Sequence, residues 1–118
     1  KPKSNMLHLN EMRDLIVPAL RGLNIQKVIV FGSYSKGNQT PQSDIDLLVV
    51  TNDDFIPENF MQKMALKTQI AKALHSLKDH SDLDLIVHTK PMYERFLQLD
   101  SGLKREILNT GTVIYETQ

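Results

Sequence analysis

Two aspartates, Asp44 and Asp46, stand two residues apart at the start of an apolar run. Side chains two apart on a β-strand face the same side, so both carboxylates would lie together. Close carboxylates repel each other unless a cation lies between them. Mg²⁺ suits such a pair, because it prefers oxygen ligands and retains waters and phosphate oxygens. Taken alone, however, an Asp-x-Asp pair is more often a solvated strand entrance than a metal site.

A second feature precedes this pair: the glycine–serine turn Gly32-Ser33 ends the previous apolar run. Gly32 permits a sharp turn and lets a phosphate approach the backbone, and Ser33 can begin a short helical turn whose free N–H groups suit a triphosphate. Ser43 and Lys36, in the loop towards Asp44, are candidate helpers, although a loop lysine is more often plain surface. Gly-Ser alone is weak evidence, because turns commonly use both residues. Combined with the aspartates, it favours a phosphate-binding turn beside a divalent-metal site.

A third carboxylate is expected from a neighbouring strand. The segment that begins at Ser81 supplies Asp82 and Asp84, again two residues apart. Asp84 lies between Leu83 and Leu85, within the apolar run, whereas Asp82 lies at the turn before it. We therefore choose Asp84, and Asp82 is the alternative.

The surrounding pattern predicts the elements that position these residues. Apolar residues recur at helical spacing over 9–23, with Asn10 as a cap and Pro18 inside the pattern. Strands are predicted at 27–31, 44–50, 83–87 and 112–115, and helices at 58–77 and 93–109, the latter broken near Gly102. Strands interleaved with long helices indicate an α/β layer.

The helix at 58–77 has an apolar face that core packing explains best. The same explanation is applied to two methionines near its start. The residues concerned are Leu66, Ile70, Ala73, Leu74 and Leu77, with Met61 and Met64.

Composition limits the function classes. With 118 residues the chain is expected to form one domain, 1–118. Lys+Arg and Asp+Glu are 14 each, so the net charge is zero and no direct nucleic-acid binding is expected. The absence of cysteine excludes disulfides, thiolate zinc sites and cysteine nucleophiles, and it fits a reducing, cytoplasmic location.

Targeting signals are also missing from the sequence. No apolar run approaches the ~18 residues of a membrane span, and no secretory signal begins the chain. Because the first residue is not Met, residues 1–5 are expected to be disordered, processed or added for expression.

Three segments together carry a family resemblance. Phe31 to Gly37, Ser43 to Val49 and Leu83 to Ile86 resemble the motifs of the DNA polymerase β-type nucleotidyltransferase superfamily, and more narrowly the minimal nucleotidyltransferases. The closing segment 111–115 is also similar to the last strand of such domains. The resemblance implies a small mixed β-sheet with helices packed mainly on one face. Tyr34 is a departure, because many relatives carry Arg there, and it puts in doubt how the triphosphate or acceptor is held.

The resemblance also implies a mechanism and a site. Two Mg²⁺ ions would serve the reaction, one held by Asp44, Asp46 and Asp84 near the acceptor hydroxyl, and one held by Asp44 and Asp46 on the triphosphate. Asp84 could take the acceptor proton. ATP would be the substrate, with Gly32, Ser33 and Ser43 binding its phosphates.

The acceptor is less defined than the donor. Larger relatives add a domain that grips the acceptor, and 118 residues leave little room for one. A protein acceptor satisfies this most simply. Resemblance to the minimal nucleotidyltransferases implies an antitoxin that transfers AMP to a HEPN ribonuclease toxin. Two alternatives stay open: a small-molecule (aminoglycoside-type) nucleotidyltransferase, completed as a homodimer, and a non-catalytic module that occludes its partner.

Overall fold

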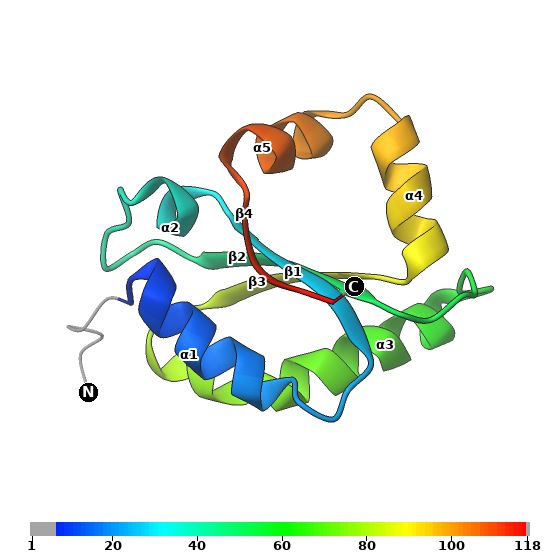
Figure 1. Cartoon of the computed structure of the whole chain (residues 1–118), viewed down its shortest axis with the longest axis horizontal. Helices are drawn as coiled ribbons and strands as arrows, with labels where there is room; N and C mark the ends of the chain where they lie inside the picture. The colour runs from blue at the N-terminus through cyan, green and yellow to red at the C-terminus, as the bar shows by residue number, and fades with distance from the viewer. Residues whose placement is uncertain (1–6, 118) are drawn as a thin grey trace.

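A four-stranded mixed sheet forms the centre of the molecule, and helices lie on both of its faces (Figure 1). The computed structural model describes residues 7–117. The strands are β1 (Ile25–Phe31), β2 (Ile45–Thr51), β3 (Leu83–His88) and β4 (Thr112–Glu116). The helices are α1 (Leu9–Ala19), α2 (Ser33–Lys36), α3 (Phe60–Ala73), the 3₁₀ helix η1 (His75–Asp79), α4 (Lys90–Gln98) and α5 (Gly102–Thr110).

The strand order β3-β2-β1-β4 decides which chain segments meet. β1 pairs antiparallel with both β2 and β4, whereas β2 and β3 are parallel and are connected through α3. Parallel pairing brings the starts of β2 and β3 to the same end of the sheet. Both predicted aspartate motifs therefore lie side by side, which confirms the predicted α/β class and the mixed sheet.

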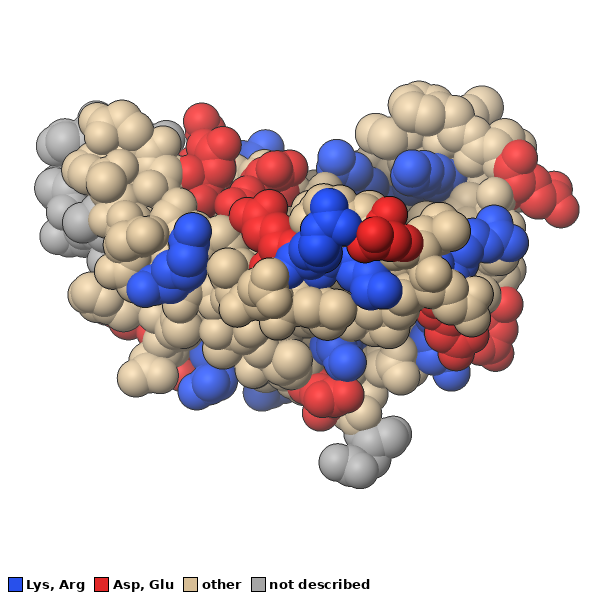
Figure 2. Space-filling view, turned by 90° about the horizontal axis from the view of Figure 1, so that it is seen from above, with Lys and Arg blue, Asp and Glu red and all other residues tan. Residues whose placement is uncertain are grey.

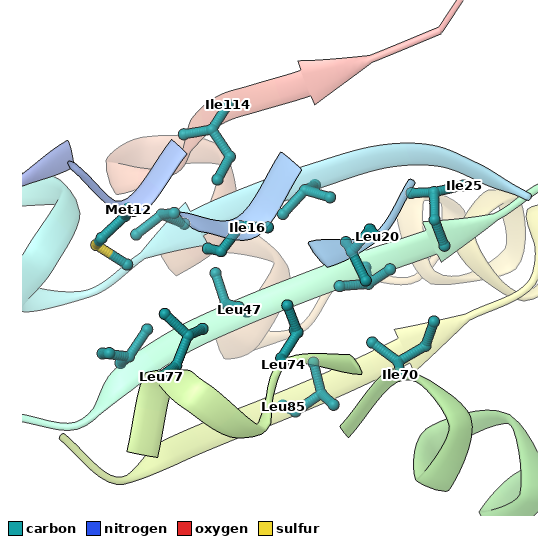
Figure 3. Packing of buried hydrophobic residues seen from close by; sticks show 14 of the residues in the cluster. Met12, Ile16, Leu20, Ile25, Leu47, Ile70, Leu74, Leu77, Leu85 and Ile114 are labelled. Atoms are coloured by element: carbon teal, nitrogen blue, oxygen red, sulfur yellow. The ribbon is translucent and has the colours of Figure 1, made fainter. Parts of the chain in front are cut away.

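Alternation along the strands builds two cores. Val28, Leu47 and Leu85 face α1 and α3, where the larger cluster includes Met12 and Ile70 (Figure 3). The residues that alternate with them face α4 and α5 and form a smaller cluster: Ile29, Phe31, Leu48, Val50 and Ile107. The larger core, on the α1 and α3 face, agrees with the expectation that helices pack mainly on one face.

Several local predictions are corrected by the structure. Glu11 accepts a hydrogen bond from the N–H of His8 at 2.9 Å, and α1 begins after His8, so the predicted cap at Asn10 is wrong. Met61 and Met64 are 80% and 37% exposed rather than packed in the core. The first turns of α3 flank the outer edge of β3, beyond which no described strand continues the sheet. The expectation for residues 1–5 lies outside the described residues.

Other boundaries follow the predictions closely. The long helical region splits into α4 and α5 before Gly102, and Ser101 caps α5 by accepting from the N–H of Lys104 at 3.1 Å. Pro18 lies in the last turn of α1 without ending it. None of the helices within 7–117 combines the length and the apolar character that a membrane crossing requires.

Candidate functional site

The turn after β1 is built around Gly32. Its φ is +75° and its ψ −150°, a backbone conformation that side-chain-bearing residues rarely adopt. A Cβ placed on Gly32 would lie 2.3 Å from Oδ2 of Asp46. Both the backbone and the neighbouring carboxylate therefore require glycine, and this contact joins the two motifs that the sequence places 14 residues apart.

Side chains from the C-terminal part of the chain hold this turn. The Ser35 hydroxyl donates to the backbone oxygen of Thr110 and lies 2.6 Å from Oγ1 of Thr112. The N–H of Gly32 points to Oγ1 of Thr110 at 3.4 Å. α2 is thereby fixed against the junction of α5 and β4, which sequence reasoning did not anticipate.

The predicted carboxylates come together at one end of the sheet. Asp46 and Asp84 are register partners in the parallel pair β2–β3. Ile45 and Leu47 belong to the larger core, so by alternation Asp46 faces the α4 and α5 side. Asp44, two residues earlier, is exposed immediately before β2. Figure 2, which looks onto the α4 and α5 side, shows acidic side chains gathered to the left of the centre.

The electrostatics of Asp46 show how crowded this cluster is. Its pKa is raised from 3.8 to about 6, first by burial and then by the charges of Asp84, Glu106 and Asp44. A hydrogen bond between the carboxyl groups of Asp46 and Asp84 acts in the same direction, and it requires a proton on one of them. A cation bound here would relieve the repulsion among these carboxylates.

Glu106 on α5 is the group that the sequence did not reveal. Its charge acts on Asp46 from across the site. The next residue, Ile107, is buried in the smaller core, which fixes this part of α5 over the sheet. A helical glutamate beside a buried apolar residue is common, so only the tertiary structure could have singled it out.

The remaining predicted residues lie around this cluster. Ser33 begins α2 and is half-buried, whereas Lys36 is exposed at its end. The Ser43 hydroxyl accepts from the N–H of Thr40 at 2.9 Å, so it also stabilises its own loop. The backbone oxygen of Asp82 accepts from the N–H of Ile45 at 2.8 Å, which ties the starts of the two parallel strands together.

Tyr34 has a structural role that explains its departure from the family pattern. The side chain is 1% exposed, and its hydroxyl lies 2.6 Å from Oγ of Ser81, itself buried. This hydrogen bond anchors α2 to the turn that leads into β3. The tyrosine therefore points into the core, and its hydroxyl is already paired.

Within residues 7–117, the side chains as they stand do not bring three His, Cys, Asp or Glu groups into a metal-binding arrangement. The donor set nevertheless fits a hard cation. Asp44, Asp46 and Asp84 supply only carboxylate oxygens, and the pKa of Asp46 is raised by burial and by the neighbouring negative charges. Rotation of exposed carboxylates would be needed to complete the set.

An apolar groove at the other end of β2 is separate from this cluster. It has a volume of about 520 Å³ and is lined by residues between Phe55 and Gln69. No predicted site residue lines it, so we do not assign it to the reaction.

Comparison with protein families gives one match over most of the chain. Residues 15–118 match the family described as polymerase beta, nucleotidyltransferase. A relative from Methanocaldococcus jannaschii, named "Putative protein adenylyltransferase MJ0604", is 29% identical over 108 residues, which are 91% of this chain and 94% of the relative.

Solved structures resemble the fold over most of its length. A crystal structure described as a toxin–antitoxin with AMP-PNP has a TM-score of 0.55 and 28% identity, and the similarity covers 90% of this chain and 74% of that one. A mutant of the toxin–antitoxin MntA-HpeT has a TM-score of 0.52 and 26% identity, with coverage of 95% and 76%.

Proposed function

The chain belongs to the polymerase β nucleotidyltransferase family, and from this premise we propose that it transfers AMP from ATP to a hydroxyl group of a partner protein. The observation that carries the proposal is the meeting of Asp46 and Asp84, register partners on β2 and β3, with the Gly32 turn against Asp46. The relative named as a protein adenylyltransferase supports a protein acceptor.

In the proposed reaction the acceptor oxygen attacks the α-phosphorus of ATP. A new oxygen–phosphorus bond forms, the bond from the α-phosphorus to the bridging oxygen breaks, and pyrophosphate leaves with that electron pair. Asp84, exposed at the start of β3, would accept the proton of the acceptor hydroxyl.

Asp44, Asp46 and Asp84 would hold Mg²⁺, and we propose two ions. Bound Mg²⁺ supplies positive charge that neutralises the triphosphate and makes the acceptor hydroxyl more acidic. The carboxylate oxygens of this cluster and the raised pKa of Asp46 support this assignment, because a bound cation would relieve the repulsion from Asp84, Glu106 and Asp44.

The phosphates of ATP are assigned to Gly32, Ser33 and Ser43. Gly32 exposes the backbone at the start of α2, and the Ser33 hydroxyl is the nearest side-chain donor along the chain. Ser43 adds a second hydroxyl from the loop before β2. The crystal structure with AMP-PNP is a toxin–antitoxin, so ATP-type ligands occur among the fold's neighbours.

We further propose that the partner is a HEPN-type toxin and that AMP transfer inactivates it. Two solved neighbours are described as toxin–antitoxin assemblies, which supports a protein partner of this kind. The resemblance of the motifs to the minimal nucleotidyltransferases points in the same direction.

The test is AMP transfer to a HEPN protein co-expressed with this chain. Label from α-labelled ATP should reach the HEPN protein in the presence of Mg²⁺, and EDTA should abolish transfer. Asp46→Asn should lower the rate by about 100-fold or more, whereas Asp14→Asn, an exposed aspartate on α1, should not change it. Transfer to an aminoglycoside, with the HEPN protein unmodified, would contradict the proposed acceptor.

A further inference from the structure

The outer edge of β3 is unpaired. β3 ends the strand order, and β2 is its one partner among residues 7–117. No described backbone group outside the β2–β3 ladder hydrogen-bonds to residues 83–88. An exposed strand edge offers a row of N–H and C=O groups that can pair with another extended chain.

A groove of about 310 Å³ follows this edge. Three successive residues of β3, Leu85, Ile86 and Val87, line it. Successive side chains of a strand point to opposite faces, so only a groove that runs along the strand's edge can touch all three. The same groove is bounded by α3 through Phe60 and Met64.

The walls of the groove combine apolar and positive groups. Phe60 is 73% exposed and Met64 37% exposed, which is unusual for large apolar side chains beside a sheet. Lys63 and Lys67, one helical turn apart on α3, complete the wall. Neither lysine forms an ion pair with another residue in the described part of the chain.

Charge changes along this edge in a defined direction. Asp84, beside Asp46, lies near the start of β3. Lys63 acts electrostatically on His88, the last residue of the strand. β3 therefore runs from the carboxylate cluster towards Lys63. Figure 2 shows lysine and arginine side chains to the right of the acidic group, beside the hollow in the outline.

We propose that the outer edge of β3 docks an extended segment of the protein that receives AMP, with an acidic side chain of that segment against Lys63 and Lys67. The proposal rests on the proposed function, since it places the acceptor hydroxyl beside Asp84. Backbone pairing along β3 supplies the alignment, an apolar residue covers Phe60 and Met64, and the charge gradient fixes the direction.

The length of β3 sets the distance between the hydroxyl and the acidic side chain of the docked segment. His88 follows Asp84 by four residues, which is about 13 Å at 3.3 Å per residue. The hydroxyl and the acidic side chain of the docked segment should thus stand about four residues apart. An acidic residue next to the hydroxyl would instead meet the carboxylates and be repelled.

The test uses short peptides and the ¹⁵N-labelled protein, without ATP, so that docking is measured separately from transfer. The first peptide carries tyrosine, then valine, threonine and leucine, then two glutamates. A second replaces both glutamates by lysine, and a third N-methylates alternate backbone amides of the first. We expect the acidic peptide to shift the amide signals of residues 60–67 and 83–88, and to bind at least about threefold tighter than either of the others.

Matched variants identify the lysines. The double substitution Lys63→Gln/Lys67→Gln should weaken binding of the acidic peptide by about threefold to tenfold. Lys72→Gln with Lys78→Gln, which removes two exposed charges from the same region, should leave binding unchanged. Equal binding of acidic, basic and N-methylated peptides would overturn the proposal. So would a loss of affinity for a non-hydrolysable ATP analogue in the Lys63→Gln/Lys67→Gln protein, because the lysines would then serve the triphosphate. If docking is observed while no AMP is transferred to any protein, the proposed function fails and the docking edge stands.

Discussion

Gly32 and Asp46 occupy adjoining space that leaves no room for a methyl group, since a Cβ on Gly32 would lie 2.3 Å from Oδ2 of Asp46. The Gly32 turn and the carboxylate cluster are therefore packed directly against each other. A change in either must displace the other.

Gly32→Ala should consequently damage both stability and activity. The backbone of an alanine at this position would be strained at this φ and ψ, at a cost of about 1–3 kcal/mol, before the clash with Asp46 is added. Displacement of Asp46 should lower the transfer rate by about 100-fold. Urea unfolding and the labelled-ATP assay measure the two effects.

Gly37→Ala is the matched control for this substitution. Gly37 also has a positive φ, +79°, but nothing lies within 4 Å of its Cβ position. It should cost only about 1–2 kcal/mol from backbone strain and leave the rate nearly intact. Equal losses of activity in both variants would mean that the Gly32–Asp46 contact is unimportant.

Metal and nucleotide should stabilise the protein through the carboxylate cluster. Ligands that bind only the folded state add about 2.7 kcal/mol at a hundredfold excess over Kd. Asp84→Asn should remove most of that gain while leaving the metal-free protein as stable as the parent, because it removes a repulsive charge beside Asp46. Thermal melts with Mg²⁺ and a non-hydrolysable ATP analogue test this, with Asp14→Asn as control; the same rise in all three proteins would exclude the shared site.

Two buried groups should give opposite pH dependences of stability. The pKa of His88 is lowered from 6.5 to about 4, mainly by burial and then by Lys63, so the unfolded chain binds more protons between those values and stability falls as pH falls. The pKa of Asp46 is raised from 3.8 to about 6, so the folded protein binds more protons there and stability rises as pH falls through that window.

Single substitutions should separate these effects. Relative to the parent, His88→Phe should gain about 1–2 kcal/mol as pH falls from 7 to 4, after discounting for solvent around the half-buried ring. The new phenylalanine ring can keep the contact with Phe96, whose ring centroid lies 5.3 Å from that of His88. The substitution also removes the buried Nδ1 of His88, which has no hydrogen-bond partner. Asp46→Asn should be more stable than the parent at pH 7 and lose that advantage towards pH 4. Urea unfolding of the parent and both variants at pH 7 and pH 4 measures these differences. The same change in unfolding free energy between the two pH values in all three proteins would refute both assignments.

Tyr34 should matter for stability and not for catalysis. Tyr34→Phe leaves the buried Ser81 hydroxyl without its partner and should cost about 1–2 kcal/mol. Combining it with Ser81→Ala should cost less than the sum of the single changes. The KM for ATP should stay unchanged at a temperature where all variants are folded; a raised KM would mean that Tyr34 holds the triphosphate.

Much of the fold could be predicted because its strands carry strong local signals. The β-branched runs that became β1 and β2 are buried along most of their length, so composition alone identified them. Asp84 could also be chosen over Asp82 from its place within an apolar run. Its exact pairing with Asp46 depends on the parallel register, which sequence does not encode locally.

The features that the sequence did not reveal share a physical cause: they depend on residues that are distant in the sequence and close in the folded structure. Met61 and Met64 look like core residues until β3 proves to be an edge strand with nothing beyond it in the described part of the chain. Glu106 approaches Asp46 only because Ile107 fixes α5 over the sheet. Tyr34 looked like an altered ligand because its partner, Ser81, is 47 residues away.

The pairing of the central strand β1 with β4 has a consequence for the timing of folding. Lys27 pairs with Glu116, so β1 cannot be enclosed on both sides until residue 116 has been made. Synthesis of the residues between Asp46 and Glu116 takes roughly 4–14 s at typical translation rates. For most of that interval the nascent chain carries Gly32, Asp44 and Asp46 but lacks Thr110 and Thr112, which brace α2. The long-range closure of β4 onto β1 is therefore the step expected to limit how fast a newly made molecule completes this sheet.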